Sequence, residues 1–105
     1  MMDKDLKMWI DEQIILYRVL WNKAMYKIAV DREDEYWLNR KLKDFEEYIK
    51  DLEDETFPLE ALNPKKYLAS YVDDIKNKYI EIQMRTIAEE KEYVKKRIEE
   101  RYGKR

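Results

Sequence analysis

The chain of 105 residues contains no cysteine and no histidine. The lack of cysteine excludes disulfides, thiolate metal sites and thiol nucleophiles, and the lack of histidine removes the commonest metal ligand and general base. One glycine and two prolines leave too few turn residues for β-hairpins or glycine-rich phosphate loops. Ser70 is the only serine, and no histidine is present to activate it. We therefore predict no catalytic residue, no metal site and no cofactor.

The sequence also lacks a long apolar run. No segment approaches the roughly 20 apolar residues that a membrane-spanning helix needs, and the first five residues do not resemble a signal peptide. We expect a cytoplasmic protein that has no membrane partner. Charged residues make up 44% of the chain, but its hydrophobic fraction of 45% is normal. This balance favours a folded, highly charged single domain over residues 1–105 rather than disorder, and the many lysines and glutamates are typical of thermophile proteins.

Residues 14–21 are apolar or aromatic at every position except Arg18. They lie within a pattern of apolar residues at steps of three and four, which predicts a helix over about residues 3–30. A helix wetted on one side needs an apolar stripe only roughly 100° wide, so this midsection offers more apolar surface than two neighbouring helices would cover. Because isologous pairing is the commonest way to bury such a surface, we predict a homodimer whose interface contains Ile15, Leu16, Val19 and Leu20.

A second amphipathic pattern predicts a helix over about residues 32–54, with apolar side chains on one face and charged ones on the other. Asp31 is suited to cap this helix, and Asp34 lies three residues on, in the position of a capping-box partner. A short turn before residue 32 is favoured. One long bent helix remains the alternative, because no glycine or proline lies between the two segments.

Residues 55–63 form the clearest linker, and a short helical turn is possible within it. Asn63 as the N-cap and Pro64 at the first helical position together mark a helix start. Apolar spacing and i,i+4 pairs of opposite charge predict one unbroken helix over about residues 64–102, with Gly103 as its C-terminal cap. The predicted fold class is all-α: a small, dimeric helical bundle of three main helices with a long C-terminal helix.

The end of this third helix differs from its start, because apolar residues become sparse beyond Ile87. At about 1.5 Å per residue, the third helix should outreach the first by roughly 16 Å. We therefore predict that residues 88–105 form an arm that projects past the bundle. Tyrosine and arginine are favoured at interface hot spots, and the predicted partner-binding residues are Tyr93, Lys95, Lys96, Arg97, Arg101 and Tyr102.

The surplus apolar surface of the first helix and the surplus length of the third favour a non-catalytic helical interaction protein. Such a protein would be an accessory subunit, adaptor or inhibitor of a larger intracellular machine, with a protein partner. The alternative is a nucleic-acid-associated regulator that uses the basic C-terminal helix, since residues 91–105 hold seven basic and three acidic residues. Nucleic-acid-binding proteins are usually strongly basic overall, whereas this chain has a net charge of −2.

A helical enzyme of the chorismate mutase type is the third hypothesis. Those enzymes resemble this chain in length and in having three helices that dimerise, and their electrostatic mechanism requires only arginine, lysine, glutamate and glutamine. Residues of these types fall in a loosely comparable order at Arg18, Lys27, Arg32 and Gln83. The first helix nevertheless lacks the early arginine, and its middle is apolar where a dianion pocket needs cations.

Overall fold

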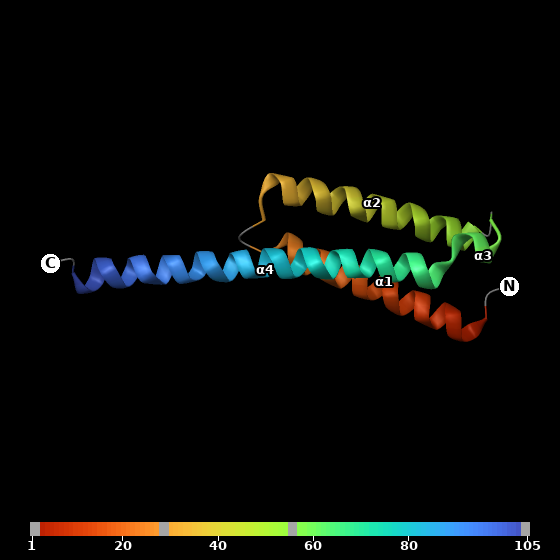
Figure 1. The fold of residues 1–105 in the computed structure, drawn as a ribbon, viewed down its shortest axis with the longest axis horizontal. Helices are drawn as coiled ribbons and strands as arrows, with labels where there is room; N and C mark the ends of the chain where they lie inside the picture. Colours follow the sequence, from red (N-terminus) through yellow and green to blue (C-terminus); the bar gives the residue numbers. More distant parts are fainter. Residues whose placement is uncertain (1–2, 28–29, 55–56, 104–105) are drawn as a thin grey trace.

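The computed structural model describes residues 3–27, 30–54 and 57–103, and within these ranges helices are its only regular secondary structure. The helices are α1 (Lys4–Met25), α2 (Arg32–Asp54), the single turn α3 (Leu59–Leu62) and α4 (Pro64–Tyr102). Figure 1 shows that α1 and α4 run in the same direction, whereas α2, which lies between them in the sequence, runs in the opposite direction. The predicted all-α class with three main helices and a long last helix is thus confirmed.

Helix α1 begins at its N-cap Asp3, whose carboxylate accepts hydrogen bonds from the amides of Asp5 and Leu6 at 2.7 and 3.2 Å. These bonds satisfy two amides that have no partner within the helix. The helix ends at Met25, five residues before the expected end near residue 30. Residues 28 and 29 of that expected segment lie outside the described residues.

A pair of aspartates fixes the start of α2. The amide of Asp34 donates to the Asp31 carboxylate at 2.8 Å, and the amide of Asp31 donates to the Asp34 carboxylate at 3.1 Å. This is the reciprocal arrangement of a capping box. Because a capping residue has a non-helical backbone, α1 must stop before residue 31, and two separate helices result in place of one bent helix.

Helix α4 has the predicted bounds. Asn63 is its N-cap in the left-handed region at φ 40°, and its backbone carbonyl accepts hydrogen bonds from the amides of Lys66 and Tyr67 at 3.2 and 3.1 Å. Asparagine tolerates this backbone conformation better than most residues. At the other end Gly103, at φ 82°, donates its amide to the Glu99 carbonyl at 3.1 Å.

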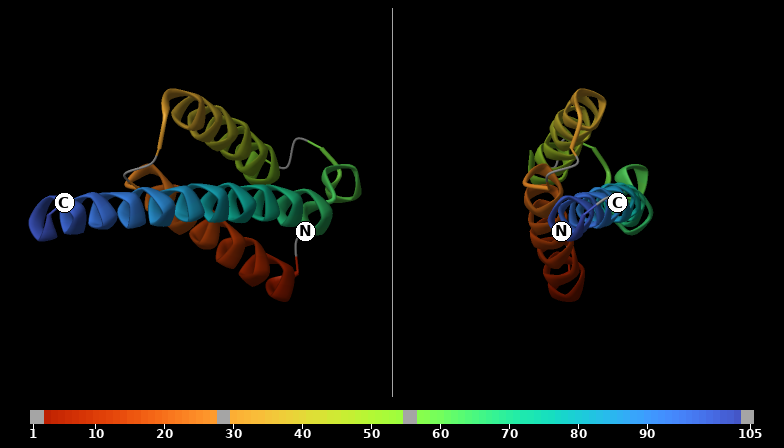
Figure 2. Two further views of the ribbon diagram at one scale, coloured as in Figure 1. Left: turned by 60° about the vertical axis from the view of Figure 1, so that its left-hand side comes forward. Right: turned by 90° about the vertical axis from the view of Figure 1, so that its left-hand side faces the viewer.

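Aromatic packing holds the three long helices together. Tyr17 of α1 stacks on Phe45 of α2 with ring centroids 4.0 Å apart, and the edge of Tyr71 of α4 meets Phe45 at 5.6 Å. The indole of Trp21 donates to the Leu38 carbonyl at 3.0 Å and joins α1 to α2. The end-on view in Figure 2 shows the helices grouped around this interior, whose largest fully buried side chains are Tyr17, Phe45, Leu38, Leu68, Ile75 and Ile82.

The molecule is elongated because α4 is much longer than its neighbours. It has 39 residues, against 22 in α1 and 23 in α2. The principal extents are 72 × 25 × 16 Å and the radius of gyration is 19.4 Å, whereas a compact domain of this size has about 13 Å. The last buried residue of α4 is Thr86. We call residues 88–103 the arm.

Candidate interaction surface

Every residue of the arm is exposed to solvent. In Figure 1 the arm continues in a straight line past the ends of α1 and α2. Val94 and Ile98 are each 53% exposed and Tyr102 is 72% exposed. The arm thus carries apolar side chains that the described parts of the bundle leave uncovered.

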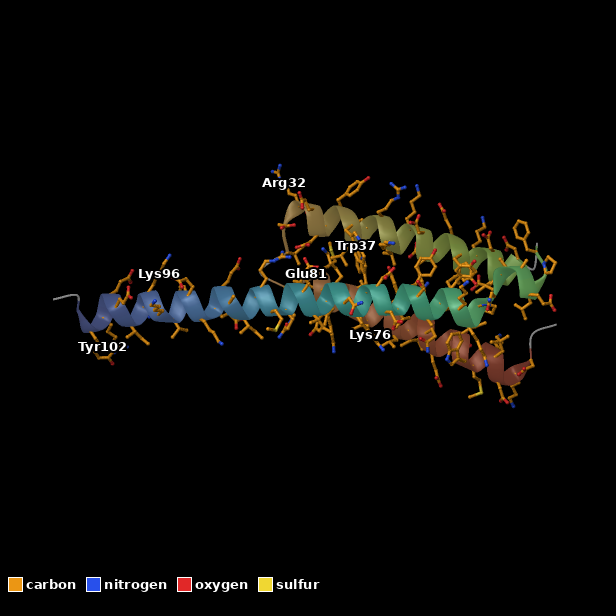
Figure 3. All side chains as sticks on the ribbon, viewed as in Figure 1. Arg32, Trp37, Lys76, Glu81, Lys96 and Tyr102 are labelled. Atoms are coloured by element: carbon orange, nitrogen blue, oxygen red, sulfur yellow. The ribbon has the colours of Figure 1, made fainter. Side chains whose placement is uncertain are left out.

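The predicted partner-binding residues do not share one face of the arm. At about 100° per residue, Lys95 and Tyr102 lie on one side with Ile98, and Tyr93 lies roughly 140° away from Ile98 on the continuation of the core face. Figure 3 shows Lys96 and Tyr102 pointing to different sides of the helix. The prediction treats these six residues as one binding surface, with both tyrosines near one side and the basic residues beside them, whereas the helix separates the six around its axis.

Tyr93 and Arg97 form a local pair within the arm. The guanidinium of Arg97 donates to the Tyr93 hydroxyl at 3.1 Å and lies 5.9 Å from the centre of its ring. Contacts at i,i+4 stabilise a helix by about 0.2–0.5 kcal/mol each. A shallow groove follows this pair along the arm and is lined by Tyr93, Val94, Arg97, Ile98, Arg101 and Tyr102.

The outward side of α1 provides a second apolar surface. Ile15 is 62% and Val19 43% exposed, whereas Leu16 and Leu20 are half-buried and pack against the core. Ile15 and Val19 lie four residues apart, and the exposed residues Met8 and Tyr26 lie on the same side of the chain, seven residues before Ile15 and seven after Val19. The predicted homodimer interface therefore consists of two accessible residues and two that are partly used inside the bundle.

A third apolar surface was not expected from the sequence. Ile80 and Met84 are 56% and 62% exposed although they lie within the bundle part of α4. With the half-buried Ile87 they extend along the helix into the arm at steps of four and three. We call this stripe the α4 seam, and its six members are Ile80, Met84, Ile87, Lys91, Val94 and Ile98. Its heptad spacing is the sequence signal that could have revealed it.

An ion-pair cluster connects the start of α2 with α4 near the base of the arm. The buried carboxylate of Asp34 accepts from Lys78 Nζ at 2.9 Å and from Arg85 Nη1 at 2.5 Å. Arg85 also approaches Asp31 at 3.5 Å and Glu81 at 3.2 Å. Glu81 and Arg85 form an i,i+4 pair within α4, whereas Lys78 reaches across to Asp34 of α2.

Two opposing effects act on the pKa of Asp34. Burial raises it, but hydrogen bonds from Arg85, Lys78 and the Asp31 amide outweigh burial and hold the pKa well below its usual range. The same carboxylate raises the pKa of Lys78 against the lowering effect of burial. Asp34, Lys78 and Arg85 are therefore all charged near neutral pH. Their cluster is an ionic contact that fixes structure and is not an acid–base pair.

The residues considered for a chorismate mutase type of site are spread over the structure. Arg18 is exposed, and Arg32 points outward at the start of α2 in Figure 3. Lys27 lies 5.5 Å above the ring of Tyr79, and the amide oxygen of Gln83 is buried with no hydrogen-bond partner among the described residues. Within the described ranges no group of three or more acidic side chains is placed to hold a metal ion.

Comparison of the chain with protein-family models, with curated proteins and with solved structures gave no match. Across the described residues, no helix combines the length and the apolar character needed to cross a membrane.

Proposed function

We propose that this protein is a non-catalytic helical interaction protein, an accessory subunit, adaptor or inhibitor of a larger assembly, and that it binds its partner through α4. The observation that carries the proposal is the arm: a well-formed helix whose residues are all exposed and include apolar side chains. Contiguous exposed apolar residues are typical of interaction sites. An arm without a partner would leave these side chains in water and add nothing to the core.

Self-association through α1 is a second part of this proposal. The exposed stripe that contains Ile15 and Val19 supports it, because two-fold pairing would cover the same stripe in both copies. Leu16→Glu or Val19→Glu should then release monomers in light scattering. If both variants keep the oligomeric state of the wild type, or if the wild type is monomeric at high micromolar concentration, α1 is not a dimer interface.

Nucleic-acid binding by the arm is the competing function. The described arm contains five basic and five acidic residues, and it lacks the excess of positive charge that phosphate contacts need. A mobility shift with DNA or RNA that weakens steeply with salt would favour this alternative.

Deletion of residues 91–105 tests the proposal directly. Since no residue of α4 beyond Thr86 is buried in the core, the truncated chain should keep its melting temperature and its oligomeric state. Affinity capture from a lysate of the source organism, followed by mass spectrometry, should recover partners with the full chain and lose them with the truncated one. Equal capture by both chains, or a large fall in melting temperature on truncation, contradicts a docking role for the arm.

A further inference from the structure

The α4 seam has the spacing of a coiled-coil interface. Its members follow one another at steps of four, three, four, three and four, and five of the six are apolar. This alternation is the a/d pattern with which one helix packs against another. In the structure the seam lies on a different side of α4 from the core, because Ile82 and Thr86 are buried while Ile80 and Met84 are exposed.

The direction of the seam can be followed in Figure 3. Lys76 and Tyr102 point to one side of α4, and Glu81 and Lys96 point to the other side, on which α2 lies. At about 100° per residue, Lys76 and Tyr102 both lie within roughly 40° of Ile80 and Ile98. The seam therefore faces away from α2 and runs from the bundle into the arm without a break.

Charges are sorted around the arm relative to this seam. At about 100° per residue, Lys91, Lys95 and Arg101 lie within roughly 60° of its centre. The five glutamates all lie roughly 80° or more from that centre: Glu89, Glu90, Glu92, Glu99 and Glu100. Although the arm has equal numbers of acidic and basic residues, its apolar stripe is bordered by positive charge.

We propose that the α4 seam binds an amphipathic helix of another protein whose apolar stripe is flanked by acidic residues. This inference rests on the proposed function of α4 and states the chemistry of its partner. Apolar residues of the bound helix would pack on Ile87, Val94 and Ile98, and its flanking carboxylates would face Lys95 and Arg101. Lys91, which occupies an a position, would reach a carboxylate beside the stripe, since a polar a residue restricts the choice of partner.

Charge argues against a second copy of this chain as the occupant. Pairing two seams would bring both sets of Lys91, Lys95 and Arg101 together across one interface. Like charges that face one another across a helix pair select against that pairing. An acidic helix has the opposite balance and removes the repulsion.

Synthetic peptides can test this chemistry with the full chain. The probe is a fluorescent peptide about four heptads long, with leucine at its a and d positions and glutamate at the flanking positions. Its control has lysine in place of each of those glutamates. Fluorescence anisotropy should give a Kd for the acidic peptide at least about ten-fold lower than for the basic one, and the difference should shrink as salt is added.

Paired variants locate the binding face. The double variant Lys95→Glu with Arg101→Glu should raise the Kd of the acidic peptide at least about ten-fold, equivalent to about 1.4 kcal/mol. Lys96→Glu reverses one charge on the far side of the arm and should have little effect, whereas Lys95→Glu alone, which matches it in charge, should weaken binding more. Val94→Asp with Ile98→Asp should abolish binding, while circular dichroism verifies that the variant is still helical. Equal loss with Lys96→Glu would mean general charge attraction and would overturn the assignment of this face.

Three further outcomes would overturn the inference. The acidic and basic peptides could bind equally or not at all. The chain alone could form dimers in sedimentation that Ile98→Asp dissociates, which would make a second copy the occupant. A nucleic-acid probe could compete with the acidic peptide and bind more tightly. If truncation at residue 91 abolishes partner capture while the acidic peptide does not bind, the proposed function stands and only the chemistry of the partner is wrong.

Discussion

The two parts of α4 have the same secondary structure but different surroundings. The part from Pro64 to Thr86 includes six buried residues, whereas the arm is exposed along its whole length. Helix formation in this chain therefore does not depend on burial at each turn. It depends on a packed segment that starts the helix and on local contacts that extend it.

The physical reason is the cost of starting a helix. An isolated helix of about 12–15 residues is marginal in water, because its first turn fixes several residues for one hydrogen bond. The arm avoids this cost because it continues a segment that tertiary packing already holds in place. The Tyr93–Arg97 contact and the Gly103 cap then support it locally. The arm should be the least stable part of α4.

The largest contrast is expected from shortening one isoleucine in each part. Ile75 is fully buried, so Ile75→Ala should lower the free energy of unfolding by about 2–5 kcal/mol through lost burial and a cavity. Ile98→Ala removes the same atoms from an exposed position and should change it by less than about 0.5 kcal/mol when the chain is monomeric. Urea unfolding followed by circular dichroism measures both. Similar losses would mean that the arm is packed against something in solution.

The Asp34 cluster gives the next largest effect and a dependence on pH. Asp34→Asn should cost about 3 kcal/mol, because it breaks a buried ion pair, while the exposed Asp73→Asn should cost little. The pKa of Asp34 is lowered in the folded state. Its contribution is therefore complete above the ordinary pKa of about 3.8 and is lost as the pH falls below that value towards the folded-state pKa. Melting temperatures between pH 7 and pH 2 should converge for the wild type and Asp34→Asn.

A glycine in each part gives the smallest and most local effect. Ala69→Gly should lower the global free energy of unfolding by about 1 kcal/mol, the usual difference in helix propensity. Ala88→Gly makes the same change at the base of the arm and should leave global unfolding nearly unchanged. Hydrogen exchange should instead become faster for amides of the arm only. Slower exchange in the arm than in the bundle would contradict the proposed order of stability.

Several local features were readable from the sequence because they depend on neighbouring residues. The Asp31–Asp34 capping box, the start of α4 at Pro64 and its end at Gly103 are all set by residues within a few positions of one another. The end of α1 was placed too late, because its apolar spacing continues after Met25 although the helix does not. Periodicity reports which side of a helix is apolar, and it does not report where the backbone stops being helical.

The sequence by itself determined the helical class, the long last helix and the loss of apolar residues towards its end, because spacing and local charge pairs act within one or two turns. Only the tertiary structure decided that Arg85 meets Asp34 across 51 positions of the chain and that Lys78 joins them. It also decided which apolar residues of α4 remain uncovered. Both depend on how α1 and α2 lie against α4, since a side chain is exposed or paired only in relation to the helices that surround it.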